Sequence, residues 1–305
     1  MVKNGHATIP KVPFVMPRGD RTGIEVLTLA DLSERMRRHG GPEGARDAAG
    51  SGRAQRPEFH LLLTVDQGLL WHMVDFTDYA VTGSAWLWVR PGQVQRFGDL
   101  HAAAGTLVLF QPDFLDADTA SEVRLDDPFG RTLWQAAGDD VAALHRALDH
   151  LAHEAAADGT PPPVRNAILQ RLLGVLLLRL THQATPVGTP PGEGAETFQR
   201  FRRAVESDFA HARDVGHYAQ ALGYAPRTLT RASLAAAGVG AKDYIDRRVI
   251  LEAKRLLAHD DAPVVSIAAR LGFPDPSNFT KYFTQRTGIT PAAFRAPYHP
   301  GRPAR

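Results

Sequence analysis

Short apolar runs with a period of two occupy residues 58–110 of the chain. Gly, Asp and Pro separate these runs, which read FHLLLTV, GLLWHMVDF, GSAWLWVRPG and GTLVLF. In the second run one set of alternate residues would share a face, namely Leu70, His72, Val74 and Phe76. Regular short strands with turn residues between them predict a small β-barrel or a sandwich.

Helical spacing replaces this alternation on either side of the β region. Apolar residues at intervals of three and four predict helices over residues 27–39, 139–157 and 163–183. We expect Asp139 or Asp140 to cap the second of these helices, because short polar side chains accept hydrogen bonds from the first N–H groups of a helix. Strands and helices together predict an α+β fold for this half of the chain.

The helix over residues 163–183 has too many apolar residues for a single buried face. They are Val164, Ile168, Leu169, Leu172, Leu173, Val175, Leu176, Leu177, Leu178 and Leu180. A surface helix of a globular protein usually has one apolar stripe. We therefore expect this helix to be buried on two sides, and a homodimer interface is one way to cover the second side.

Residues 184–196 include the stretch ATPVGTPPGEGA, whose composition is typical of a linker between domains. After it the period is helical, with almost no strand character. Seven helices are predicted, over residues 197–211, 214–222, 227–237, 241–258, 266–271, 277–286 and 291–296. Residues 197–305 are thus expected to form an all-α domain, separate from a first domain over residues 1–183.

Charge is divided unevenly between these two parts. The whole chain has 35 Lys and Arg against 33 Asp and Glu, a formal net charge of +2. Residues 200–305 have a net charge of +8, from 17 basic and 9 acidic residues, whereas residues 1–199 have a net charge of −6. A basic domain beside an acidic one indicates a polyanionic partner that meets one end of the molecule.

The chain contains no cysteine, which excludes disulfides, thiolate metal sites and thiol nucleophiles. Its most apolar run, residues 172–178, lies between Arg171 and Arg179 and is too short to span a membrane. The N-terminal stretch MVKNGHATIPKVPF lacks the apolar core of a signal peptide. We therefore expect a cytoplasmic protein that makes no membrane contact.

One motif occurs twice in the basic domain, over residues 214–239 and 264–289. Each copy has a short helix, a Leu-Gly-Tyr or Leu-Gly-Phe turn, and a longer helix entered at a proline. A helix-turn-helix needs a small residue where its helices cross and a glycine that accepts positive φ at the turn. The candidate pairs are Ala219 with Gly223 and Ala268 with Gly272. Two such units would place recognition helices in successive major grooves, about 34 Å apart.

Helical spacing also predicts which sides of the two recognition helices face inward. Phe279 and Phe283 would anchor the second helix, and Leu229 and Leu234 the first. The polar residues left to reach base edges are Arg227, Thr230, Arg231, Ser277, Asn278 and Lys281. Further arginines suited to phosphate contacts are Arg200, Arg202, Arg203, Arg247, Arg248 and Arg255.

The run SIAARLGFPDPSNFTKYFTQRTGITPAAFR resembles the signature of the AraC/XylS-type transcription regulators, and the similarity covers nearly all of residues 200–296. The resemblance implies a ligand-responsive activator that binds double-stranded DNA and acts on RNA polymerase. It also implies base-facing positions, which fall on Arg227, Thr230, Arg231, Pro276, Ser277, Asn278 and Lys281. Pro276 stands where the family often has a polar side chain, and a proline side chain cannot hydrogen-bond a base.

The N-terminal half of that family is often a cupin-like β-barrel that binds a small effector, followed by helices that dimerise. By resemblance the barrel would occupy about residues 58–125 and the helices about residues 139–183. The segment WLWVRPGQVQRFG is similar to the P-G-x-x-H motif of such barrels, with Gln95 in place of the histidine. Small-molecule sites usually combine aromatic walls with a few polar groups. The candidate effector-binding residues are His72, Trp86, Trp88 and Gln95.

A metal-dependent cupin enzyme needs three or four ligands from this region, where only His60 and His72 occur as single histidines upstream of Gln95. We therefore expect no catalytic residues, no metal and no cofactor. Two alternatives remain open at this point. One is a metal-dependent cupin enzyme fused to a DNA-binding tail, and the other is a constitutive DNA-binding protein whose barrel only dimerises.

Overall fold

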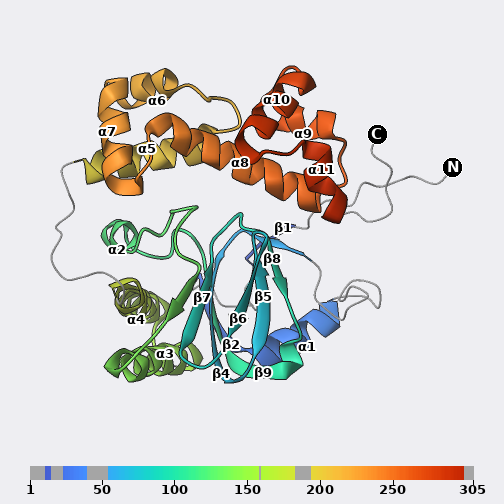
Figure 1. Cartoon of the computed structure of the whole chain (residues 1–305). Coiled ribbons are helices and arrows are strands. Elements are labelled where there is room, and N and C mark those ends of the chain that lie inside the picture. Colours follow the sequence, from blue (N-terminus) through green and yellow to red (C-terminus); the bar gives the residue numbers. More distant parts are fainter. Residues whose placement is uncertain (1–10, 15–22, 40–53, 158, 183–193, 299–305) are drawn as a thin grey trace. The chain divides into compact units, whose positions relative to one another are not determined.

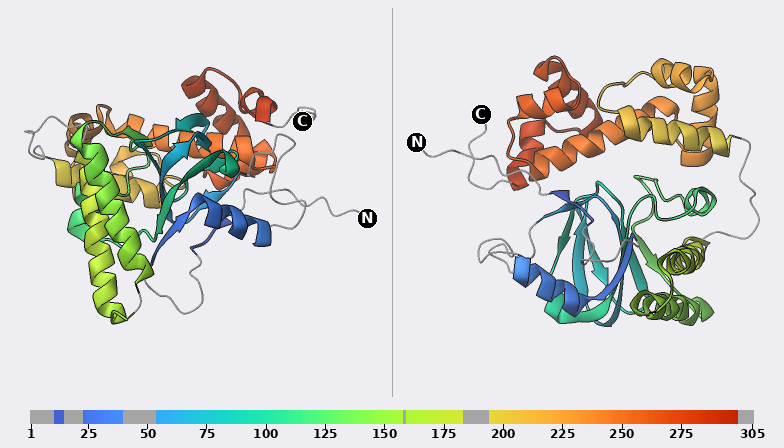
Figure 2. Two further views of the ribbon diagram at one scale, coloured as in Figure 1. Left: turned by 90° about the horizontal axis from the view of Figure 1, so that it is seen from below. Right: turned by 180° about the vertical axis from the view of Figure 1, so that it is seen from behind.

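The computed structural model describes residues 11–14, 23–39, 54–157, 159–182 and 194–298. The chain divides into two compact units, which lie within residues 10–186 and residues 187–305. The first unit combines sheets with helices and the second is helical, as Figures 1 and 2 show. The predicted linker over residues 184–196 falls almost entirely outside the described residues.

Five strands of the first unit form an antiparallel sheet in the order β10–β7–β4–β9–β2. Their bounds are β2 Ile24–Thr28, β4 His60–Gly68, β7 Ala85–Val89, β9 Ala103–Phe110 and β10 Leu133–Gln135. At the centre of the sheet Leu63 of β4 lies between its register partners Leu87 and Leu107. The predicted runs FHLLLTV, WLWV and GTLVLF are therefore the three inner strands.

Three further strands form a second antiparallel sheet in the order β6–β5–β8, and two short strands form a parallel pair. Their bounds are β5 Leu70–Val74, β6 Thr77–Val81, β8 Gln95–Phe97, β1 Lys11–Val12 and β3 Arg56–Pro57. β5 ends at Val74 because Asp75 and Phe76 both have positive φ, at 44° and 64°, and form the turn to β6. Phe76 thus does not continue the alternation that its sequence predicts.

The described strands are hydrogen-bonded as separate sheets and not as one continuous closed barrel. The two larger sheets pack on each other through a core that includes Leu63 and Leu87 from one sheet and Leu70, Val74 and Phe97 from the other. This arrangement confirms a mixed fold of strands and helices. The closed barrel and its cupin-like identity remain predictions.

The described helices of this unit are α1 Leu29–His39, α2 Ala117–Glu122, α3 Asp139–Ala156 and α4 Pro162–His182, with a short 3-10 turn at Leu100–Ala102. α3 and α4 cover the outer face of the five-stranded sheet, whereas Leu29 of α1 belongs to the core between the two sheets. Figure 2 shows α3 and α4 lying side by side. Gly138, whose φ is 58°, is the N-cap of α3, so neither Asp139 nor Asp140 caps this helix. Both aspartates lie in the first turn instead, where a negative charge still interacts favourably with the helix dipole.

One side of α4 packs into the core of the first unit, and the other side is open. Leu169, Leu173, Leu176, Leu177 and Leu180 are buried there. The opposite side keeps Val164 and Val175 exposed, at 51% and 47%. No helix in the described part of the chain has the length and apolar character that a membrane span requires.

The described part of the second unit contains the seven helices that the sequence predicts. They are α5 Ala195–Asp208, α6 Val215–Leu222, α7 Pro226–Ala237, α8 Ala241–His259, α9 Val264–Arg270, α10 Pro276–Thr287 and α11 Pro291–Arg295, followed by a 3-10 turn at Ala296–Tyr298. One hydrophobic core joins both halves of this unit, from Phe201 and Leu229 through Ile245 and Leu257 of α8 to Phe279. α8 lies between the two helix-turn-helix units and is buried along most of its length.

Candidate nucleic-acid interface

The first helix-turn-helix unit consists of α6, a turn and α7. Gly223 ends α6 with a φ of 71°, which is the left-handed conformation predicted for this turn. Ala219 is buried at the crossing, at 2% exposure, and Leu229 anchors α7 at 0%. Leu234 is 52% exposed, so the prediction that it points inward is wrong. Ala232 and Ser233 occupy the inner side of α7 instead, because they lie three and four residues after Leu229.

The second helix-turn-helix unit repeats this geometry with α9 and α10. Gly272 has a φ of 72°, and Ala268 is fully buried before it. Phe279 and Phe283 are both 0% exposed, and their ring centroids lie 5.9 Å apart. The prediction that these two rings anchor α10 is therefore confirmed. Asp275 caps this helix by accepting a hydrogen bond from the Ser277 N–H at 2.8 Å.

The predicted base-facing residues lie on the sides of α7 and α10 that turn away from the core. Those that the structure leaves exposed are Arg227, Arg231, Ser277, Asn278 and Lys281. Thr230 and Pro276 are partly buried. The Thr230 hydroxyl donates a hydrogen bond to the Pro226 carbonyl oxygen at 3.1 Å, so it must give up this bond to donate to a base.

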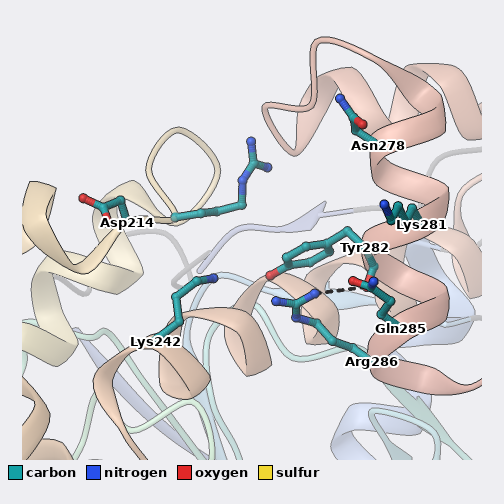
Figure 3. Close-up of a pocket in the computed structure, with 8 residues that line it drawn as sticks. Asp214, Lys242, Asn278, Lys281, Tyr282, Gln285 and Arg286 are labelled. Atoms are coloured by element: carbon teal, nitrogen blue, oxygen red, sulfur yellow. Dashed lines mark hydrogen bonds between the residues drawn. The ribbon is translucent and has the colours of Figure 1, made fainter.

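A cationic hollow of about 570 Å³ lies beside α10. Its lining residues are Arg213, Asp214, Lys242, Asn278, Lys281, Tyr282, Gln285 and Arg286. Figure 3 shows five of these side chains along α10, with Lys242 and Asp214 across the hollow. The hollow thus adjoins two predicted base-facing residues, Asn278 and Lys281, and adds further cationic groups to them.

Beneath this hollow, Asp246 of α8 binds α10. Its carboxylate accepts hydrogen bonds from the Tyr282 hydroxyl at 2.6 Å, from Arg286 at 2.5 Å and from Lys242. Burial raises the pKa of Asp246, but these three donors outweigh it and hold the pKa below its ordinary value. Burial and the adjacent Asp246 carboxylate both raise the pKa of Tyr282, which therefore stays a neutral donor.

Three of the six arginines suggested for phosphate contacts lie inside the domain. Arg202, Arg248 and Arg255 have exposed fractions of 1%, 7% and 2%. Arg248 Nε donates to both carboxylate oxygens of Glu206, at 2.8 and 2.9 Å, and its guanidinium lies 3.8 Å from the centre of the Phe209 ring. The prediction is therefore wrong for these three residues. The other three, Arg200, Arg203 and Arg247, are exposed.

The comparisons with known proteins agree with this geometry. A family model described as a helix-turn-helix domain matches residues 218–297. The chain contains an AraC-type helix-turn-helix domain. It is homologous to the transcriptional activator RhaR of Cronobacter sakazakii, with 26% identity over 247 residues that cover 78% of this chain and 84% of RhaR. The activator RhaS of Pectobacterium carotovorum is 24% identical, over 78% of this chain and 85% of RhaS.

Among solved structures, ToxT from Vibrio cholerae O395 is similar to the chain with 12% identity and a TM-score of 0.38, covering 79% of this chain and 89% of ToxT. The C-terminal domain of the response regulator YesN from Fusobacterium nucleatum has 21% identity and a TM-score of 0.31, and it covers 33% of this chain and 98% of that domain.

Outside the AraC-type domain, the four candidate effector-binding residues do not lie together. His72 and Gln95 are both buried in the second sheet, with His72 Nε2 3.1 Å from Gln95 Oε1. Trp86 and Trp88 belong to the core between the five-stranded sheet and the helices, while Leu87 between them faces the other sheet. The structure thus brings His72 to Gln95 and places the two tryptophans on the far side of another strand layer.

The buried polar residues near Trp88 form a separate cluster. The Trp88 indole N–H donates to His60 Nδ1 at 3.2 Å, and the Arg90 guanidinium lies 4.5 Å from the Trp88 ring centre. Burial and the nearby Arg90 charge lower the pKa of His60 well below its ordinary value. Among the described residues, no three His, Asp or Glu side chains gather as they would around a metal ion.

Two residues of the AraC-type domain that the sequence interpretation missed are Arg213 and Asp246. Arg213 lies in the loop between α5 and α6, and Asp246 lies on the buried side of α8. The hydrogen-bond partners of Arg213 are 58 and 59 residues away along the chain. Two partners of Asp246, Tyr282 and Arg286, are 36 and 40 residues away, and the third, Lys242, is on the same helix. Local periodicity carries no information about such distant pairs. The one available signal was an acidic residue at a core-facing position of a helix, where an unpaired charge is costly.

Proposed function

We propose that the chain is a sequence-specific DNA-binding transcription regulator of the activator class. The observation that carries this proposal is that α7 and α10 each bury one side in the common core and expose Arg227, Arg231, Ser277, Asn278 and Lys281 on the other. Such side chains read base edges in the major groove, where each base pair has a distinct donor and acceptor pattern. The homology to RhaR and RhaS, which are named transcriptional activators, supports the same function.

The proposal is tested by selecting fragments of genomic DNA on the full-length protein. A regulator of this kind enriches a common site with two recognition elements about one helical turn apart, and binds it roughly 10³-fold or more tightly than shuffled DNA. The genes beside the enriched sites would also indicate the pathway and its metabolites. Equal retention of all fragments would contradict sequence-specific binding.

We further propose that the first unit binds a small effector in a cupin-like fold and that the protein is not an enzyme. His72 and Gln95 are the polar pair inside its second sheet, and they are the most specific candidates for an effector contact. Screening metabolites of the pathway found by DNA selection would test this, with operator affinity as the readout. If none changes operator affinity, the result would favour the alternative of a constitutive DNA-binding protein whose first unit only dimerises. Stoichiometric iron, manganese or zinc in the purified protein would instead favour the enzyme alternative.

We propose a homodimer that forms through the open side of α4. The exposed Val164 and Val175 lie eleven residues apart, which places them on one side of the helix. Replacing both with glutamate should yield monomers in sedimentation velocity, while Ala142→Glu on the exposed side of α3 should not. Dimers of unchanged affinity in the double variant would exclude this face. The cytoplasm is the proposed location and RNA polymerase the proposed second partner.

A further inference from the structure

Arg213 connects the two helix-turn-helix units directly, outside the connecting helix α8. It lies in the loop that precedes α6, at the entrance to the first unit. Its Nη1 donates to the Leu271 carbonyl oxygen at 2.9 Å and its Nη2 to the Gly272 carbonyl oxygen at 2.7 Å. Leu271 and Gly272 form the turn of the second unit, so one side chain of the first unit binds the turn of the second.

The same guanidinium also packs against an aromatic ring that leads to α10. Its central carbon lies 3.7 Å from the centroid of Phe273. The Phe273 ring contacts Phe279 and Tyr282 of α10, at centroid distances of 5.3 and 5.1 Å. Arg213 therefore contacts the ring of Phe273, which directly follows the turn and packs against the second recognition helix, α10. Burial lowers the pKa of Arg213, as expected for a guanidinium partly removed from water.

The loop that carries Arg213 is itself bound to the first helix-turn-helix unit. The Ala212 carbonyl oxygen accepts a hydrogen bond from the Tyr218 hydroxyl of α6 at 2.8 Å. Tyr218 is 1% exposed and packs on Phe201 of α5. On one side of Arg213 the loop is thus held to the core of the first helix-turn-helix unit. Through Arg213 itself it is held to the turn of the second helix-turn-helix unit.

A second contact between the two units lies beside the first and does not involve a charge. A Cβ atom built on Gly272 would lie 2.0 Å from the Ala210 carbonyl oxygen, which no real pair of atoms tolerates. The matching glycine of the first helix-turn-helix unit, Gly223, has nothing within 4 Å of such a Cβ atom. Both glycines have the same left-handed conformation, so the crowding at Gly272 comes from the loop of the other unit. Two independent contacts therefore join the loop at residues 210–213 to the turn at residues 271–273.

We infer that Arg213 fixes the distance and rotation between the recognition helices α7 and α10, and so determines which spacing of the two DNA elements the protein accepts. The two helix-turn-helix units also meet through α8 and the hydrophobic core packed on it. The Arg213 contact joins them at a point away from α8, where it restricts the bending and twisting that packing on one shared helix permits. The DNA part of this inference rests on the proposed function, whereas the rigidity of the domain does not.

The rigidity is measured first, on the full-length protein without DNA. The chain has no native cysteine, so Ala235→Cys on α7 and Ala292→Cys on α11 introduce two spin labels at exposed positions without background. Double electron–electron resonance should give one narrow distance distribution with Arg213 present and a clearly broader one in the Arg213→Met variant. Arg247→Met is the matched control, because Arg247 is an exposed arginine on α8. An equally narrow distribution in Arg213→Met would overturn the inference.

A second variant guards against a domain that fails to fold. Arg213→Lys keeps the positive charge but cannot form the two parallel bonds to Leu271 and Gly272. It should remain folded by circular dichroism and still broaden the distance distribution. A narrow distribution in a folded Arg213→Lys variant would also overturn the inference, since a single bond would then suffice.

Binding to DNA is the second readout. On the selected site, adding one base pair between the two elements should weaken wild-type binding, and Arg213→Met should reduce this spacing preference by about tenfold. If Arg213 only contacts a phosphate, the variant should instead lose affinity equally at every spacing and lower the salt slope by about 0.9. That result, with an unchanged distance distribution, would assign Arg213 to phosphate binding. If the wild type selects no site at all, the proposed function fails, while the distance measurement still decides the rigidity.

Discussion

Gly272 and Ala210 approach so closely that a single added methyl group would overlap the Ala210 carbonyl oxygen. Gly272 has a φ of 72°. Gly223, at the same place in the first helix-turn-helix unit, has a φ of 71°, so alanine would adopt a left-handed conformation at either position. Only at Gly272 would it also meet another segment of the chain, at 2.0 Å. The pair therefore separates backbone strain from steric overlap within one domain.

We predict that Gly223→Ala lowers the free energy of unfolding of the helical domain, which lies within residues 187–305, by about 1–2 kcal/mol, the cost of a left-handed alanine. Gly272→Ala should cost roughly 3 kcal/mol or more, because the backbone must also move. Far-UV circular dichroism during denaturant unfolding measures both. All four tryptophans, Trp71, Trp86, Trp88 and Trp134, lie in the other domain, within residues 10–186. Tryptophan fluorescence therefore shows in parallel whether the stability of that domain is unchanged. Equal losses in the two variants would contradict the close approach.

Leu229 and Leu234 of α7 should differ sharply when truncated, although the sequence predicts the same inward direction for both. Leu229→Ala is expected to cost about 2–5 kcal/mol, because its side chain is fully buried in the core of the unit. Leu234→Ala should stay within about 0.5 kcal/mol, since its side chain is 52% exposed. Unfolding curves of the two variants at equal pH check this. A large loss in Leu234→Ala would restore the original prediction.

The first unit should lose stability as the pH falls below 6.5. Burial lowers the pKa of His72 to about 4, with the Gln95 hydrogen bond opposing it, and burial also lowers the pKa of His60. A depressed folded-state pKa contributes stability above the unfolded value near 6.5, and this is lost as the pH falls toward the folded value. Each histidine contributes a slope of about 1.4 kcal/mol per pH unit between these values.

His72→Gln should remove one of these two contributions and leave the slope due to His60. The slope is measured by tryptophan fluorescence during unfolding at several pH values between 6.5 and 4. This comparison holds even if the substitution lowers the overall stability, because only the dependence on pH is compared. A slope identical to that of the wild type would show that His72 takes up its proton without unfolding.

Several parts of the fold follow from local sequence and others do not. Five of the seven helices described in the second unit, namely α6, α7, α9, α10 and α11, have a proline at the start or a glycine at the end. These residues act on the backbone within a single turn, so the positions of such helices are predictable to within a few residues. The strand β7 is buried on both faces, as AWLWV, and alternation cannot show which face meets which core. The placement of Trp86 and Trp88 opposite Leu87 therefore required the structure.

The charged residues of α8 show the same limit. Arg248, Glu252 and Arg255 have the spacing of one helix side, and that side packs toward Glu206 of α5, where the charges are paired. A count of basic residues assigns Arg248 and Arg255 to DNA, because it contains no information on which helix side is covered. Exposed Arg247, beside Arg248 in the chain, shows that one position decides the difference.

The most direct test of the central claim is the affinity of full-length Asn278→Ala and Lys281→Ala for the selected site and for shuffled DNA. Both side chains are exposed on α10, whereas Phe279 between them is fully buried. If they read bases, each variant should lose about 1–3 kcal/mol of binding free energy on the selected site, tolerate base changes at one position, and bind shuffled DNA almost as the wild type does. An equal loss on both DNAs would assign them to phosphates, and no loss on either would contradict α10 as a recognition helix.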